Sequence, residues 1–293
     1  MSTLAWKVVV PSYNRPEGFR DKTLATLKFH QVPPSNIYLF VANEEQKDAY
    51  EQVLQKGEVG HIIVAEKGLP QVRNFIFNYF PKGTPLVSFD DDVRGFVRLE
   101  GEKLRPLRVP EFKQLVDLAF AECKRVGANF WGDYPVPNGF YMENSISYDL
   151  KFIMGSFWGC LNPGSDVQIT IGNGEKEDYM RTIQFWERDG KVVRMNFWAH
   201  KTATYNEAGG LQSDGVKARQ EREHSTVDKM LKKYAQYVRR NPRRKGLFPE
   251  ILFIRQPFEG ERKRFLNKNK NKKTRSAAKP DSHKQTRKYK LKN

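Results

Sequence analysis

The stretch Leu86-Val87-Ser88-Phe89-Asp90-Asp91-Asp92-Val93 indicates both the fold and a candidate site. Its first four residues are mostly apolar and predict a short buried strand. Three carboxylates follow at the carboxyl end of that strand, where open α/β sheets bind their ligands. Adjacent aspartates repel one another unless a cation neutralises them, and clustered carboxylates suit Mg²⁺ or Mn²⁺, usually together with substrate phosphates. We therefore expect a metal site here; a solvated acidic turn is the alternative.

Predicted strands and helices alternate up to these aspartates. In order, they are a strand at 7–10, a helix at 21–30 with Asp21 as its N-cap, a strand at 37–42, a helix at 44–55, a strand at 61–65, a helix at 69–79 and a strand at 86–89. Alternation at this spacing predicts a parallel sheet with right-handed crossovers. Polar clusters follow the first, second and fourth strands, so they should lie along one edge of the sheet. The sequence thus predicts an α/β fold with one site at that edge.

The remainder of the chain has less regular spacing. In order, it predicts a helix at 112–126, strands and loops in the aromatic and glycine-rich segment 128–160, a helix at 175–188, a strand at 192–200, a loop at 209–213, a helix at 219–240 and a strand at 251–254. The apolar and aromatic content suffices for a core, so we expect most of the chain to fold.

Composition excludes several classes of protein. Two cysteines, Cys123 and Cys160, form neither a disulfide framework nor a zinc site, and no apolar run reaches membrane-spanning length. A strand is predicted from Lys7 onward, which leaves no room for a signal peptide. We therefore expect an intracellular protein, cytoplasmic or nuclear, without a membrane partner; a monomer fits the sequence.

The positive charge is concentrated at the end of the chain. Residues 262–293 hold 14 Lys or Arg and one Asp, so they carry +13 of the net +17 and leave +4 for residues 1–261. A segment this polar cannot bury enough apolar surface to fold, so we expect it to be disordered. Dense positive charge favours contact with nucleic-acid phosphates, and a nuclear import signal or a solubilising tail are the alternatives.

Four motifs follow the order in which they occur in the GT-A glycosyltransferases, a family that this sequence resembles over residues 7–181. They are the Val-Pro-Ser-Tyr-Asn-Arg run at 10–15, Gly-Leu-Pro-Gln-Val-Arg-Asn at 68–74, the triple aspartate as a DxD motif, and Glu177-Asp178 with Arg181. More narrowly, the sequence resembles the TET/JBP-associated glycosyltransferases, relatives of the base J glucosyltransferases in phages, viruses and some eukaryotes. The resemblance implies a GT-A fold, a Rossmann-like, mainly parallel sheet flanked by helices.

The resemblance also implies an activity. It implies transfer of a hexose, with glucose expected, from a nucleotide sugar such as UDP-glucose to hydroxymethylcytosine or hydroxymethyluracil in DNA, with Mn²⁺ or Mg²⁺ as cofactor. A virus- or phage-infected host is one setting for such a protein. Residues 1–101 would be the nucleotide-sugar-binding half, 102–261 the acceptor-binding and catalytic half, and 262–293 the basic tail.

The resemblance implies a separate role for each aspartate of the acidic motif. Asp92 is the expected direct metal ligand, and Asp90 is expected at the metal or at the ribose. Asp91 is assigned to the nucleotide side, with a purely structural role as the alternative. A later histidine completes the metal shell in many relatives, and His200 is the candidate; a structural histidine is the competing interpretation.

The residues expected to line the nucleotide are Pro11, Ser12, Tyr13, Arg15, Glu44 and Arg73. Tyr13 would stack on the base and Arg15 would fork to phosphate, although turn formation also explains Tyr13 and Asn14. Glu44, or Glu45 beside it, would accept from the base, or else complement the dipole of the helix that begins there. Arg73 would lie near the phosphates, or else be a surface cation.

Asp178 occupies the general-base position of inverting relatives, where it would deprotonate the acceptor hydroxyl. Glu177 is the second candidate for that role. An acidic first helical turn is the structural alternative for both residues. Phe157 and Trp158 would stack an extruded base, or else belong to the core.

Three other functions remain open from the sequence. One is a GT-A transferase acting on protein or glycan, another is a non-catalytic nucleic-acid-binding protein on the same fold, and the third is a nucleotidyltransferase. The intact acidic positions favour an enzyme over a protein that has lost its chemistry.

Overall fold

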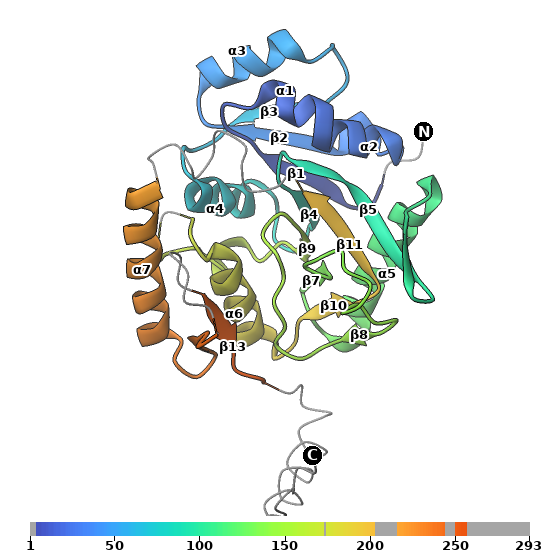
Figure 1. Ribbon diagram of the computed structural model, residues 1–293. Helices are drawn as coiled ribbons and strands as arrows, with labels where there is room; N and C mark the ends of the chain where they lie inside the picture. The colour runs from blue at the N-terminus through green and yellow to red at the C-terminus, as the bar shows by residue number, and fades with distance from the viewer. Residues whose placement is uncertain (1–3, 173, 203–215, 244–249, 257–293) are drawn as a thin grey trace, which may run out of the picture. The chain divides into compact units, whose positions relative to one another are not determined.

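The computed structural model describes residues 4–172, 174–202, 216–243 and 250–256 (Figure 1). Within them, eight strands form one sheet in the order β3-β2-β1-β4-β9-β7-β10-β8. These strands are β1 (Lys7–Pro11), β2 (Ile37–Val41), β3 (His61–Val64), β4 (Pro85–Phe89), β7 (Phe130–Asp133), β8 (Ile146–Ser147), β9 (Phe157–Leu161) and β10 (Val193–Met195). Only β8 and β9 run against the other six. The predicted mainly parallel α/β fold is confirmed.

Helices cover both faces of this sheet. On one face lie α1 (Pro16–Phe19), α2 (Ala25–Phe29), α3 (Glu44–Val53) and α5 (Val109–Val126), which pack with Val8 and Val10 of β1. On the other lie α4 (Leu69–Tyr79) and α6 (Glu177–Asp189), which pack with Val9. Alternate residues of a strand point to opposite faces, so the continuous apolar run of β1 serves two cores. The strand predicted at 7–10 is therefore covered on both faces.

Two small sheets complete the described part of the chain. One has the order β11-β5-β6, built from β5 (Val93–Glu100), β6 (Lys103–Pro106) and β11 (Trp198–Thr202). The other pairs β12 (Val238–Arg240) with β13 (Ile251–Phe253), beside α7 (Val216–Lys233). A cluster that includes Met180 of α6, Met230 of α7 and Ile251 of β13 joins these last elements to the main body.

Several predicted boundaries were wrong. The first helix begins at Pro16 rather than Asp21, because proline suits the first helical position, and it continues through a π-helical stretch, Arg20–Leu24, into α2. The predicted strand 192–200 is two strands that belong to different sheets. The predicted helix 219–240 ends at Lys233. The β5–β6 hairpin was not predicted. Both the predicted loop 209–213 and the tail lie outside the described residues.

Candidate functional site

The carboxyl ends of β1 and β4 bring the first polar cluster to the aspartates. Ser12 Oγ donates to Asp91 Oδ2 at 2.5 Å, and Arg15 Nη1 donates to Asp91 Oδ1 at 3.3 Å. The Tyr50 hydroxyl of α3 lies 2.5 Å from Ser12 Oγ. Burial raises the pKa of Asp91, although the Ser12 hydrogen bond and the Arg15 charge oppose the rise. Asp91 therefore faces Ser12 and Arg15, two of the residues expected to line a nucleotide, and ties them to the acidic loop.

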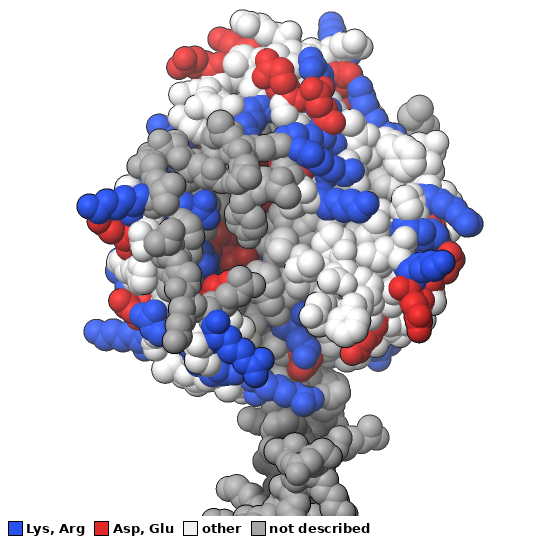
Figure 2. Space-filling model, viewed as in Figure 1, with Lys and Arg blue, Asp and Glu red and all other residues white. Residues whose placement is uncertain are grey.

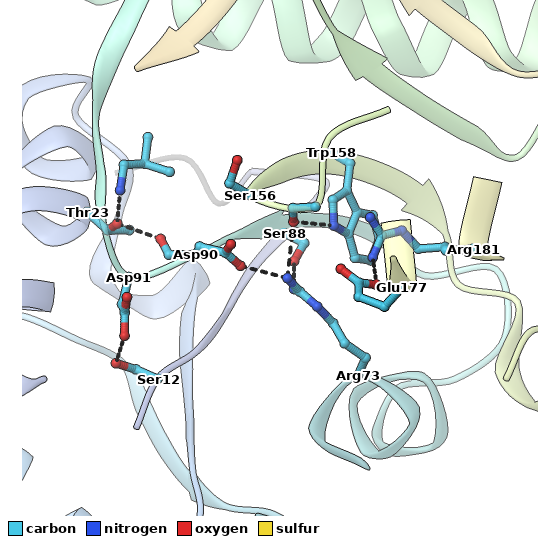
Figure 3. Close-up of polar contacts among 12 residues, drawn as sticks. Ser12, Thr23, Arg73, Ser88, Asp90, Asp91, Ser156, Trp158, Glu177 and Arg181 are labelled. Carbon is cyan, nitrogen blue, oxygen red and sulfur yellow. Dashed lines mark hydrogen bonds and ion pairs between the residues drawn. The ribbon is translucent and has the colours of Figure 1, made fainter. Parts of the chain in front are cut away.

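Arg73 of α4 holds the neighbouring aspartate (Figure 3). Its Nη2 atom donates to Asp90 Oδ1 at 2.7 Å and to the Gly155 carbonyl at 3.1 Å, and its Nη1 atom donates to Ser88 Oγ at 2.5 Å. Arg73 is 1% exposed, so the interpretation as a surface cation was wrong. The Asp90 side chain is 35% exposed, and its pairing with the buried Arg73 guanidinium fixes the direction in which it points.

Asp92 is the aspartate that remains available. It is half-buried, and within the described residues its carboxylate has no hydrogen bond or ion pair. Burial, followed by repulsion from Asp90 and Asp91, raises the pKa of Asp92 to about 6. A divalent cation would relieve that repulsion. Figure 2 shows Asp or Glu side chains deep in a hollow of the face that is drawn.

The donor set fits Mn²⁺ or Mg²⁺ better than it fits zinc. Among the residues that the structure places, no three His, Cys, Asp or Glu side chains are grouped as a ready-made metal site. Magnesium-type sites commonly use one or two carboxylates and take their other ligands from water and substrate phosphates. Asp92 with Asp90 is such a pair, so the residues present fit the metal that was predicted.

His200 lies near this pair and is buried between two hydrogen-bonding partners, Asp133 and Ser156. Its Nδ1 atom lies 2.9 Å from Asp133 Oδ2, its backbone N–H donates to Asp133 Oδ2 at 2.6 Å, and its Nε2 atom lies 2.6 Å from Ser156 Oγ. Burial by itself lowers the pKa of His200, but the Asp133 charge and hydrogen bond, with the charges of Asp90 and Asp92, raise it above its usual value. A carboxylate on the second ring nitrogen is typical of metal-ligating histidines.

Sequence reasoning missed Asp133 and Ser156. Asp133 is the last residue of β7, so an acid that ends an apolar strand was the available indication, as it was for Asp90. Ser156 carried no such indication. It joins the site because its carbonyl accepts from the Asp90 N–H at 2.9 Å, across the antiparallel pairing of β4 with β9.

The two acids that begin α6 have different surroundings. Glu177 is buried and accepts from Arg181 Nη1 at 2.5 Å, while the fully buried Arg181 guanidinium lies 4.2 Å from the centre of the Trp158 ring. Asp178 is half-buried, and its Oδ1 atom accepts from the Tyr179 N–H at 2.9 Å. Burial, then repulsion by Glu177, raises the pKa of Asp178 to about 6. Of the two, Asp178 has the carboxylate that is free to take a proton.

Other predicted residues lie at the border of the site or outside it. Lys67 Nζ lies 5.3 Å from the centre of the Tyr13 ring, and Tyr13 is half-buried. Pro11 is buried as the last residue of β1. The Glu44 side chain is 76% exposed in the first turn of α3, with Lys47 Nζ 3.8 Å away, so the structure does not bring it into the acidic cluster.

The predicted base-stacking role of Phe157 and Trp158 was wrong. Their exposed fractions are 0% and 1%, because β9 lies inside the central sheet and both of its faces are covered. Their alternative, membership of the core, holds. Trp158 still matters to the site, because the Arg181 guanidinium packs on its ring and its Nε1 atom donates to the Gly155 carbonyl at 3.0 Å.

A cavity of about 410 Å³ lies away from this chemistry. It is lined by Phe120, Cys123 and Leu161, among other residues, at the edge of the sheet where β4 begins. The lining is largely apolar and offers no carboxylate. The acidic edge, and not this cavity, is therefore the candidate site. No helix in the described ranges is both long enough and apolar enough to cross a lipid bilayer.

Comparisons with known proteins complete this description. No family model and no curated protein sequence matches the chain. Among solved structures, the chain is similar to a mannosyltransferase from Pyrobaculum calidifontis, in complex with GDP-Man and Mn²⁺, with a TM-score of 0.48 and 12% identity over 80% of this chain and 65% of that one. It is also similar to glucosyl-3-phosphoglycerate synthase from Mycobacterium tuberculosis, in complex with Mn²⁺, UDP-glucose and phosphoglyceric acid. The TM-score is 0.44, with 11% identity over 87% of this chain and 90% of that one. A third similar structure is a cytidylyltransferase from Leptospira borgpetersenii, with a TM-score of 0.33 and 14% identity over 54% of this chain and 60% of that one. No function follows from likeness of this degree.

Proposed function

We propose that the protein is a metal-dependent glycosyltransferase that moves a hexose, with glucose expected, from a nucleotide sugar to a hydroxymethylated pyrimidine in DNA. The observation that carries the proposal is the Asp92 carboxylate. It is half-buried, without a partner among the described residues, and raised in pKa to about 6 beside Asp90 and Asp91. Such a group is suited to a cation that arrives with a diphosphate.

The residues around Asp92 have different proposed roles in binding the donor. Arg73 orients Asp90 toward the site, and Asp91 holds Ser12 and Arg15 at the nucleotide side. When bound, Mn²⁺ or Mg²⁺ would supply Lewis-acid stabilisation of the departing diphosphate. His200, oriented by Asp133, would be a further ligand of the metal.

Asp178 acts on the acceptor. It takes the proton from the acceptor hydroxyl while that oxygen forms a bond to the anomeric carbon of the sugar. The bond from the anomeric carbon to the diphosphate oxygen breaks, and its electron pair leaves with the diphosphate. A pKa of about 6 suits this role, because the carboxylate is ionised at neutral pH and still basic enough to accept a proton.

DNA as the acceptor rests on two features of the sequence. The first is the resemblance to the TET/JBP-associated glycosyltransferases. The second is the +13 charge of residues 262–293, which suits the phosphate backbone of a nucleic acid. The resemblance, rather than the charge, selects the hydroxymethyl group as the point of transfer.

The test is mass spectrometry of nucleosides. Hydroxymethylated and plain DNA are incubated with a panel of nucleotide sugars and Mn²⁺, with excess EDTA as the metal control. A hexose should appear on the hydroxymethylated base only, and only with metal. Transfer to a protein or glycan but not to DNA would support the alternative acceptor. Full transfer in EDTA would overturn the metal dependence, and DNA binding without any transfer would favour a non-catalytic protein.

A further inference from the structure

The turn before α6 is held by α7 through buried ion pairs. Arg222 Nε lies 2.8 Å from Glu175 Oε1, and Lys176 Nζ lies 3.1 Å from Glu223 Oε2. The side chains of Glu175 and Glu223 are only 1% and 6% exposed, so these pairs are screened little by solvent. Two successive residues of one turn are thus bound to two successive residues of one helix.

The backbone of this turn is tightly fitted to the same helix. Gly172 has φ +74°, and a Cβ atom on it would lie 2.8 Å from Thr226 Oγ1. Lys176 takes a left-handed conformation, with φ +57°, directly before α6 begins at Glu177. A non-glycine residue in this region is held there by its surroundings. Here those surroundings include the Lys176–Glu223 pair.

Asp178 depends on this turn for its position. It is the second residue of α6, and its carboxylate has no ion pair among the described residues, so the backbone of the first helical turn decides where it lies. On the sheet side, the Glu177–Arg181 pair fixes the same turn. The opposite side is fixed by α7, which packs along α6 through the cluster containing Val227 and Met230 (Figure 1).

We propose that Arg222 and Glu223 of α7 are positioning residues that set the location of the Asp178 carboxylate by holding residues 174–176. This inference rests on the proposed function in one respect, namely that Asp178 takes the proton from the acceptor. Its structural part, the hold of α7 on the turn, stands on the ion pairs alone.

The central variant is Arg222→Ala, with Arg222→Lys as the conservative variant that keeps the charge. Turnover should fall roughly 10- to 100-fold in Arg222→Ala, because a misplacement of about 1 Å is that costly, and it should recover in part in Arg222→Lys. Donor affinity with Mn²⁺, measured by calorimetry, should not change, since the residues proposed to bind the donor and the metal lie outside α6 and α7. Asp228→Asn is the matched control on α7, because Asp228 pairs with Arg240 at the surface.

A second readout does not depend on activity. Hydrogen exchange of the amides in 174–182 should be faster in Arg222→Ala than in wild type and unchanged in Asp228→Asn. If Arg222→Ala does not fold, Glu223→Gln takes its place, since it removes the charge opposite Lys176 and keeps the shape. Faster exchange with wild-type turnover would overturn the positioning role, and unchanged exchange would overturn the hold itself. If the wild-type protein transferred no sugar, the proposed function would fail, and the exchange comparison would still decide the structural part.

Discussion

Asp90, Asp91 and Asp92 are consecutive, yet each carboxylate has its own surroundings. Asp91 accepts from Ser12 and Arg15, Asp90 pairs with Arg73, and Asp92 has no such partner within the described ranges. Asp91 and Asp92 form the turn between β4 and β5, and the three adjacent carboxylates therefore reach three different environments. This difference makes their functions separable by single substitutions.

Asp92→Asn and Asp178→Asn should fail in different ways. Asp92→Asn removes the carboxylate expected to bind metal, so it should weaken donor binding and lower turnover. Asp178→Asn keeps its shape but cannot accept a proton, so kcat should fall by roughly 10²–10⁴-fold with donor affinity unchanged. Transfer rates and calorimetric donor titrations of both variants give the comparison. Near-normal turnover in Asp178→Asn would contradict the base assignment and point to Glu177 or to a retaining mechanism.

The raised pKa of Asp92 also predicts a change in stability. A carboxyl group whose pKa is about 6 when folded and about 3.9 when unfolded contributes stability that is present below pH 4 and lost as the pH rises through 6. At pH 7.5 in EDTA, Asp92→Asn should therefore raise the free energy of unfolding by about 1–3 kcal/mol, and near pH 4 the gain should vanish. Urea unfolding at both pH values measures it. An equal gain in the surface variant Asp228→Asn would show that the effect is not due to burial of charge.

At the scale of elements, two helices on the same face of the sheet each deliver a buried arginine to β9. The Arg73 guanidinium of α4 lies 5.5 Å from the centre of the Trp158 ring, and that of Arg181 in α6 lies 4.2 Å from it. Each arginine also pairs with one acid of the site, Asp90 or Glu177. A strand that appears purely structural therefore orients both ends of the candidate site.

The close approach of β9 to β7 predicts a packing defect. A Cβ atom on Gly159 would lie 2.2 Å from the Trp131 ring, so Gly159→Ala forces this core pair apart and should lower the free energy of unfolding by about 1–3 kcal/mol. Gly18→Ala in α1 is the control, because a Cβ there would lie 3.6 Å from its nearest neighbour, Arg15 Cβ, and its free energy of unfolding should rise by about 0.5–1 kcal/mol. Denaturant unfolding of both variants measures these changes. An unchanged unfolding midpoint in Gly159→Ala would mean that the Trp131 ring can move aside without loss of stability.

At the scale of the whole molecule, the uneven distribution of charge predicts a separation of roles. Removal of residues 262–293 takes away +13 of the net +17 charge. DNA binding should weaken, and the dependence of its affinity on salt should flatten, because fewer counterions are released. Donor affinity should stay the same. A variant of equal length with the tail's Lys and Arg changed to Gln separates charge from length. Full-length affinity and salt dependence in the shortened protein would show that the tail serves localisation or solubility instead.

The sequence by itself determined the first four strands of the central sheet, β1 to β4, and the edge at which the candidate site lies. The apolar runs of β1, β2 and β4, the bounds of α4, and the place of Asp90–Asp92 after a buried strand were all predicted correctly. Each depends on local features: a run of apolar residues, a helical period, or a break at proline or glycine. The roles assigned by resemblance to the site residues stay predictions.

Only the tertiary structure decided which side chains meet. The Asp133–His200 pair joins residues 67 positions apart, and Arg73 is buried because α4 faces β9, a strand that follows it by about eighty residues. The hold of α7 on residues 174–176 has the same origin. Periodicity shows which face of an element is apolar, but the partner of that face is chosen by packing across the whole chain. The buried guanidinium groups of Arg73 and Arg181 lie where that packing brings each of them to a carboxylate.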